Sequence, residues 1–157
     1  MTKITASQVN DLRKQTGAGM MDCKKALVEA NGDFEKAIDV LRKKGQKVAA
    51  KRADRETSEG VVLSLTNNEN NVGGMISLNC ETDFVAKNSS FIELANSILM
   101  IALKHECSDL DSIKSLDLDG SMSVHDKLVE QTGVIGEKIE LSNYFIIKSD
   151  YVTGYIH

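Results

Sequence analysis

The part of this sequence best suited to chemistry is a short connector that places a carboxylate next to an aromatic ring. Asp83 and Phe84 lie within residues 79–88, between a strand pattern that ends at Cys80 and a helix-start signal at Ser90. A phenylalanine in a connector usually folds back into the core, and on this interpretation a one-turn helix buries Phe84. The alternative is an exposed wedge, in which the carboxylate and the aromatic tip project from a rigid corner between a hairpin and a helix.

Other groups of residues are weaker candidates for catalysis or metal binding. Gly17 and Gly19 match the first two glycines of a dinucleotide-binding loop, but no strand pattern precedes them. Residues 105–109 contain a histidine, a glutamate, a cysteine and an aspartate, but zinc sites need about four ligands at matched spacing. Cys80 is a poor nucleophile candidate because neighbouring carboxylates disfavour its thiolate. We therefore expect a protein without catalytic residues, metal or cofactor, and a thiol or metal enzyme is kept as an alternative.

The composition excludes several classes of protein. The chain has 157 residues, of which 41% are hydrophobic and 27% are charged, so wholesale disorder is excluded. Aromatic residues make up only 4% and the net charge is −4, which argues against a protein that coats nucleic acid. Three cysteines suit a reducing compartment, and the longest apolar stretch, residues 97–103, is far shorter than a membrane span. No secretory signal is visible, and we expect a soluble cytoplasmic protein.

The first 45 residues are expected to form a domain of three short helices. Thr5 and Gln8 have the spacing of a capping box at the start of the first helix. Asp33 is expected to cap the third helix, and Gly45 is expected to end it. A unit this small buries little surface, so it is either marginally stable or docked against something else.

Residues 42–55 form the one basic run, with seven Lys or Arg against the single acid Asp54. We interpret residues 46–59 as a solvated linker helix between two modules. The functional alternative is a contact with an acidic partner such as RNA or an acidic protein face. The run lacks the interleaved aromatic residues that are typical of nucleic-acid binding, which favours the linker.

From Gly60 onward the hydrophobic pattern alternates, which indicates strands. Residues 61–66 and 72–80 are expected to form a hairpin around the turn residues 67–71, with Gly73 and Gly74 hinting at a bulge. The fold class that follows is α+β, with an antiparallel sheet and flanking helices.

The rest of the chain offers two helices and two strands. A second capping box, Ser90 with Glu93, is expected to open an amphipathic helix that reaches about residue 105. A short helix is expected over residues 124–131, and strands over residues 138–148 and 151–156. We divide this part into a first core subdomain, residues 60–137, and the start of a second, residues 138–157. A strand at the very end of the chain suggests that the sequence is a piece of a longer protein.

Three segments of the sequence resemble bacterial translation elongation factor Ts. They are Thr-Gly-Ala-Gly-Met-Met-Asp-Cys-Lys-Lys-Ala-Leu at residues 16–27, Glu-Ala-Asn-Gly-Asp at residues 29–33, and Thr-Asp-Phe-Val-Ala-Lys-Asn at residues 82–88. The resemblance covers essentially the whole chain as the amino-terminal half of the family. The first 45 residues also resemble a ubiquitin-associated-type three-helix module.

This resemblance implies guanine-nucleotide exchange on elongation factor Tu, a GTPase, in its GDP-bound or nucleotide-free form. Asp83 and Phe84 match the family's wedge, whose phenylalanine enters the GTPase near its magnesium site and displaces the groups that hold the ion. Thr82 and Val85 complete the motif. No bond is made or broken by such a factor, so the resemblance agrees with the lack of a catalytic set.

The resemblance also implies further contacts with the GTPase, and these involve Leu12, Met20, Lys24, Ile135, Gly136 and His157. No membrane or direct nucleic-acid partner is expected, and any association with the ribosome should be indirect. The alternative function is a ribosome-associated module in which the three helices bind a helix or peptide and the basic run binds RNA.

Overall fold

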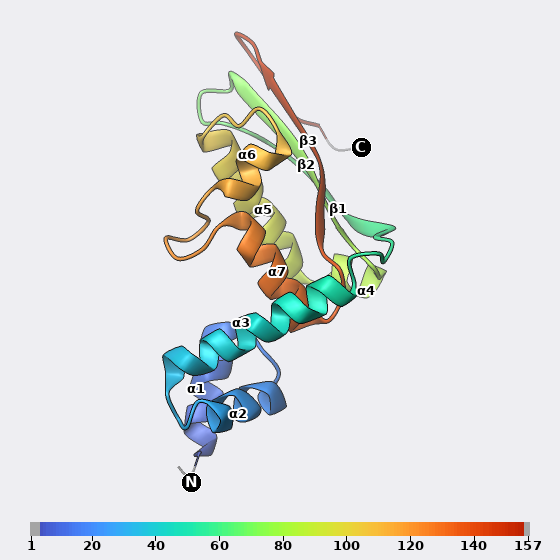
Figure 1. Cartoon of the computed structure of the whole chain (residues 1–157). Helices are drawn as coiled ribbons and strands as arrows, with labels where there is room; N and C mark the ends of the chain where they lie inside the picture. The colour runs from blue at the N-terminus through green and yellow to red at the C-terminus, as the bar shows by residue number, and fades with distance from the viewer. Residues whose placement is uncertain (1–3, 156–157) are drawn as a thin grey trace. The chain divides into compact units, whose positions relative to one another are not determined.

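The computed structural model describes residues 4–155 and divides into two compact units (Figure 1). The first unit comprises the residues up to Asp54 together with Val129–Glu137, and the second comprises Arg55–Leu128 together with the residues from Lys138 onward. Within the described residues the fold is α+β, with seven helices and one three-stranded antiparallel sheet. The expected fold class is therefore confirmed.

The first unit is built on α1 (Ala6–Thr16), α2 (Met20–Glu29) and α3 (Phe34–Lys51). The three helices appear in the predicted order and close on a shared apolar core. That core consists of the buried residues Val9, Leu12, Ala18, Cys23, Ala26, Leu27, Ala30 and Ala37.

Side-chain caps fix the starts of α1 and α3, as the sequence predicted. The Gln8 amide donates to Thr5 Oγ1 at 3.3 Å, and the Thr5 amide donates to Gln8 Oε1 at 2.9 Å, which completes the capping box. Asp33 Oδ1 accepts a hydrogen bond from the Lys36 amide at 3.1 Å. These bonds satisfy amide groups that the helices themselves leave unpaired.

The expectation that Gly45 ends the third helix is wrong, because α3 continues to Lys51 as one helix. Gly45 is buried, and a Cβ atom added to Gly133 would lie only 2.4 Å from the Gly45 Cα. Gly133 lies within α7 (Val124–Ile135), which continues beyond the predicted helix of residues 124–131. Both glycines belong to the first unit, where they let two helices approach closely.

We predict that Gly133→Ala lowers the free energy of unfolding by about 1–3 kcal/mol, because the added methyl group collides with backbone rather than with a flexible side chain. Urea unfolding followed by circular dichroism measures this change. Gly19→Ala is the matched control, since its Cβ would meet nothing closer than Asp22 Oδ2 at 3.8 Å. Equal destabilisation by both substitutions would contradict the close helix contact.

The second unit contains the sheet, with strands β1 (Glu59–Thr66), β2 (Val72–Cys80) and β3 (Glu140–Lys148) in the order β1-β2-β3. Both pairings are antiparallel, and the predicted hairpin brings Thr66 opposite Gly73. The sequence therefore placed all three of these strands correctly to within two residues at each end.

No bulge forms at the two glycines of β2. The irregularity lies instead between Ser77 and Leu78, in the pairing with β3. A Cβ atom on Gly74 would lie 2.7 Å from Leu103 Cδ2, and one on Gly73 would lie 2.6 Å from Val152 Cγ1. These glycines make room for side chains packed on the sheet, which explains their presence without a bulge.

The strand expected over residues 151–156 does not form over the part that the structure describes, residues 151–155. The Val152 amide instead donates to the Asn70 carbonyl at 2.6 Å, and the Val152 side chain lies against Gly73. The segment therefore contacts the hairpin turn instead of extending the sheet.

Helices cover one face of the sheet, where α5 (Ser89–Lys104) packs on β1 and β2 and α6 (Leu110–Ser115) contacts β3 (Figure 1). The predicted Ser90–Glu93 capping box at the start of α5 is wrong. Asn88 is the cap, and its Oδ1 accepts a hydrogen bond from the Ser90 amide at 3.0 Å. Helix α6 was not predicted from the sequence, since it lies in a stretch rich in serine and aspartate.

The face of the sheet without helices leaves several large apolar side chains exposed, namely Val62, Met75, Phe145 and Ile147. The helical face contains the core of the second unit, in which Phe91 is the largest buried side chain. No helix within residues 4–155 is long and apolar enough to cross a membrane.

Candidate functional site

The candidate site is the corner between β2 and α5, which is formed by the one-turn helix α4 (Asp83–Ala86). Backbone hydrogen bonds make this turn regular: the Ala86 amide donates to the Thr82 carbonyl at 3.2 Å and the Lys87 amide donates to the Asp83 carbonyl at 3.1 Å. The turn packs on β1 and β2 and leads directly into Asn88, the cap of α5. Two regular elements therefore hold both ends of the corner.

The ring of Phe84 projects from this corner into solvent, with 82% of the residue exposed. Thr82, Val85 and Ala86 are only partly exposed, so the inner side of the turn is occupied by smaller side chains. The interpretation of a one-turn helix with Phe84 buried is therefore half right, because the turn forms and the ring stays outside.

Asp83, beside Phe84, forms an ion pair with Lys87 in which Lys87 Nζ donates to Asp83 Oδ2 at 2.6 Å. This hydrogen bond, followed by the charge of the same lysine, holds the pKa of the Asp83 carboxyl below its ordinary value. The pair likewise raises the pKa of Lys87. The corner therefore presents an ionised carboxylate next to an exposed aromatic ring at neutral pH.

We predict that Lys87→Ala raises the pKa of Asp83 back toward its ordinary value of 3.8, because the lysine supplies the largest shifts. An NMR titration of the Asp83 side-chain carbon measures this pKa. In the unmutated chain, the lowered pKa means that the pair stabilises the fold above the ordinary pKa and loses this effect as the pH falls. Lys14→Ala, which removes an exposed lysine from α1, should leave the Asp83 titration unchanged. An unshifted pKa in Lys87→Ala would contradict the ion pair.

Contacts behind the corner tie it to the start of β3. The Lys138 amide donates to Glu81 Oε1 at 2.7 Å, and Lys138 Nζ donates to the Arg55 carbonyl at 3.2 Å. Cys80 is fully buried, and its thiol donates to the Thr82 carbonyl at 3.2 Å. No local pattern in the sequence indicates Glu81 or Lys138 as supports, because 57 residues separate them along the chain.

The other residues implied by the resemblance lie in the first unit, apart from His157, which lies outside the described residues. Met20 is 54% exposed at the start of α2, and Lys24 is exposed on the same helix. Leu12 is fully buried in the three-helix core. Ile135 and Gly136 are partly exposed at the end of α7, where Gly136 has a φ of 82°. Thr82, Asp83, Phe84 and Val85 lie together in the second unit.

The structure does not support the alternatives of a thiol enzyme or a metal enzyme. Cys23, Cys80 and Cys107 are buried free thiols, and burial followed by the charge of Asp109 raises the pKa of Cys107. Within residues 4–155, no three histidine, cysteine, aspartate or glutamate side chains gather in a way that could hold a metal ion. His105 and Cys107 therefore do not form the site considered from the sequence.

Comparison with known proteins relates the chain to one family. Residues 81–157 match the family model described as Elongation factor TS. The whole chain is 60% identical to elongation factor Ts from Christiangramia forsetii, of which it covers 56%. It is 55% identical to that of Rhodopirellula baltica and 54% identical to that of Flavobacterium johnsoniae, again over all 157 residues, covering 47% and 48% of those proteins. The chain thus spans about half the length of the curated relatives it matches.

Proposed function

We propose, from the premise that this chain belongs to the elongation factor Ts family, that it takes part in translation elongation as a guanine-nucleotide exchange factor. Its partner is elongation factor Tu, which it binds in the nucleotide-free or GDP-bound form. The observation that carries this proposal is the exposed ring of Phe84 on an ordered corner, beside the ionised Asp83.

The ring of Phe84 acts as the wedge that enters the GTPase near its magnesium ion. Magnesium requires nearly ideal octahedral coordination at about 2.0–2.1 Å, so a small displacement of its supports weakens the grip on the nucleotide. Burial of a phenylalanine side chain in the partner contributes roughly 1.5–3 kcal/mol. Each ~1.4 kcal/mol is a factor of ten in affinity, so one ring offsets about one to two decades of nucleotide binding.

The rigidity of the corner is essential to this role. The backbone that carries the ring is already ordered by α4, by the cap of α5 and by the contact between Glu81 and Lys138, so it loses little freedom when the ring enters the partner. Thr82 and Val85 hold the turn against the sheet, and Asp83 offers a negative charge to a hydrogen-bond donor on the GTPase. The proposal therefore gives each residue of the motif a distinct task.

The first unit provides a second, docking contact in this account. Residues 1–45 act as a ubiquitin-associated-like domain in which Met20 and Lys24 contact the GTPase. Leu12 supports that surface from the core, since its own side chain is buried. Ile135, Gly136 and His157 add further contacts.

The domain organisation that accompanies this function keeps residues 46–59 as the basic connection between the docking domain and the core. Residues 60–137 form the first core subdomain and residues 138–157 begin a second. Because α3 extends to Lys51, the connection consists of the end of that helix and the segment before β1.

A binding experiment with nucleotide tests the proposal, because the coupling between two ligands of one protein is reciprocal. The immobilised 157-residue chain should retain nucleotide-free elongation factor Tu and release it when excess GDP is added. ATP, which differs in its base, serves as the control nucleotide and should release nothing. Failure to retain the GTPase, or retention that GDP does not change, would overturn the exchange function.

A further inference from the structure

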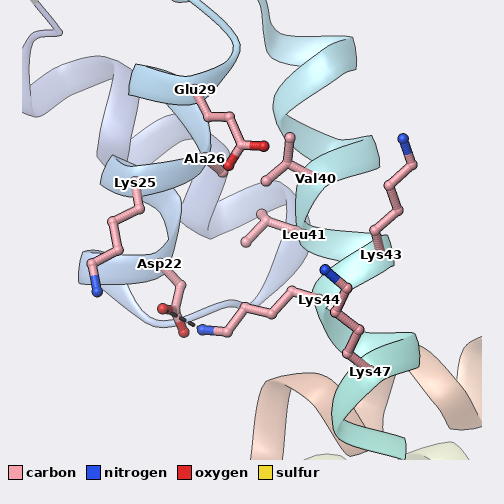
Figure 2. Close-up of a pocket in the computed structure, with 9 residues that line it drawn as sticks. All are labelled: Asp22, Lys25, Ala26, Glu29, Val40, Leu41, Lys43, Lys44 and Lys47. Atoms are coloured by element: carbon pink, nitrogen blue, oxygen red, sulfur yellow. Dashed lines mark ion pairs between the residues drawn. The ribbon is translucent and has the colours of Figure 1, made fainter. Parts of the chain in front are cut away.

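A groove lies between α2 and α3 (Figure 2). It has a volume of about 360 Å³ and lies entirely within the first unit. Its apolar floor consists of Ala26 from α2 and of Val40 and Leu41 from α3, whose side chains point toward α2 in Figure 2. Val40 and Leu41 pack on the three-helix core but stay partly exposed, so a ligand can still cover them.

Charged side chains surround this floor at helical spacing. On α2 the lining residues Asp22, Lys25 and Glu29 are separated by three and four positions, so they follow one side of the helix. On α3 the lining lysines Lys43 and Lys47 are four positions apart, and Lys44 is adjacent to Lys43. The lining runs over residues 22–29 of α2 and 40–47 of α3, eight residues each, so each wall of the groove extends for about two helical turns.

The charge of the groove is positive although the chain as a whole carries −4. Lys44 forms an ion pair with Asp22, which neutralises both, and this contact is drawn in Figure 2. Among the residues that the structure describes, Lys25, Lys43 and Lys47 form no ion pair. Glu29 is the remaining acidic residue of the lining, so the six charged lining residues carry a net charge of +2. In Figure 2 the Lys25 and Lys43 side chains point away from the floor, so their charges lie at the rim of the groove.

We propose that this groove binds an acidic amphipathic helix of another protein, with apolar side chains on the floor and carboxylates toward the lysines. An amphipathic helix in an apolar groove is a common mode of recognition, with anchors at positions i, i+3, i+4 and i+7. Charge complementarity then selects an acidic helix over a basic one. The groove includes neither Phe84 nor the docking residues Met20 and Lys24, although it shares α2 with those two residues, so the inference goes beyond the exchange function.

Nucleic acid fits this groove less well than an acidic helix does. A phosphate backbone would leave the apolar floor of Ala26, Val40 and Leu41 without a partner, whereas the apolar side of an amphipathic helix would cover it. No aromatic ring lines the groove, so a single-stranded base would find nothing to stack on. RNA is therefore the competing ligand in the test.

The test uses the 15N-labelled 157-residue chain and four defined probes. The first is a 15-residue helical peptide with leucines at positions i, i+4 and i+7 and glutamates beside them. The second replaces its glutamates with lysine, the third replaces its leucines with serine, and the fourth is a 15-nucleotide polyuridine. We expect only the first to give saturable shifts at the amides of Ala26, Val40 and Leu41, at concentrations up to about 1 mM.

Charge reversal on α3 then tests the lysines. The double variant Lys43→Glu/Lys47→Glu should weaken binding of the acidic peptide by about tenfold, because each close attraction becomes a repulsion. The control, Lys14→Glu/Lys104→Glu, makes the same change in net charge at exposed positions outside the groove and should change affinity by less than about twofold. Both variants alter exposed side chains, and circular dichroism verifies that they fold.

The outcomes separate the alternatives. Selective binding of the acidic, leucine-bearing peptide, lost in the groove variant and kept in the control, supports the proposal. Shifts caused by polyuridine but not by the peptide would overturn it, as would equal binding of the serine peptide or an absence of shifts at the floor. GDP release from elongation factor Tu should be unchanged in Lys43→Glu/Lys47→Glu, so failure here is distinguishable from failure of the exchange function.

Discussion

Replacing Phe84 with alanine is expected to reduce the acceleration of GDP release from elongation factor Tu by about 10- to 100-fold. The substitution removes a ring that is 82% exposed in the free chain and that we place inside the GTPase in the complex. Stopped-flow fluorescence of a labelled GDP, mixed with excess unlabelled nucleotide and increasing amounts of the chain, measures the release rate. Because the ring makes little contact within its own protein, the variant should unfold at the same urea concentration as the unmutated chain.

Phe145→Ala is the matched control for this experiment. Phe145 is also an exposed phenylalanine of the second unit, 66% exposed, but it lies on the sheet in β3 and not at the corner. Its removal should leave the release rate within about twofold of the unmutated chain. Equal loss of activity in both variants, or full activity in Phe84→Ala, would show that the corner is not the wedge.

Replacing Phe91 with alanine is expected to have the opposite pattern of effects, with a large loss of stability. Phe91 lies only seven residues beyond Phe84 but is 1% exposed, and it is the largest fully buried side chain of the fold described here. It lies in the first turn of α5, which packs on β1 and β2. Truncation of a buried phenylalanine lowers the free energy of unfolding by about 3–5 kcal/mol, through lost burial and the cavity left behind.

Urea unfolding of Phe91→Ala and Phe84→Ala, measured side by side, checks this contrast. The Phe84 variant should differ from the unmutated chain by less than about 0.5 kcal/mol, as surface substitutions usually do. A conservative change, Phe91→Leu, retains most of the volume and should lose clearly less stability than Phe91→Ala. If Phe84→Ala were the more destabilising of the two alanine variants, the assignment of one ring to the surface and the other to the core would be wrong.

Local signals in the sequence were sufficient for the starts of α1 and α3 and for the three strands of the sheet. The spacing of Thr5 and Gln8 and the position of Asp33 predicted caps that the structure contains, because such caps depend on residues within one turn. Alternating apolar residues predicted the hairpin for the same reason. These features are determined over distances of a few residues along the chain.

Most of the predictions that were wrong depended on partners far away in the sequence. Gly45 is a residue type that often ends helices. Its role here is instead the close contact with Gly133, which lies 88 positions further along the chain. Gly73 and Gly74 are explained by side chains packed against the sheet, which no local pattern reveals. At the start of α5, the predicted cap Ser90 was wrong, because the side chain of Asn88, two residues earlier, accepts the hydrogen bond from the Ser90 amide.

The candidate site could be located from the sequence but not described from it. The position of Asp83 and Phe84 between a strand and a helix was correct, whereas the exposure of the ring was undecided between two interpretations. The ion pair with Lys87 follows from its spacing of four residues and could have been anticipated. The support from Lys138 and the groove between α2 and α3 could not, because both require the tertiary fold.

The measurement that tests the central claim most directly is GDP release from elongation factor Tu with magnesium and after its removal by EDTA. If Phe84 acts by loosening the ion, the unmutated chain should exceed Phe84→Ala by about tenfold or more with magnesium present. Without magnesium the two should accelerate release to within about twofold of each other, since the ring then has no ion to dislodge. An equal advantage of the unmutated chain under both conditions would contradict a wedge that works through the metal.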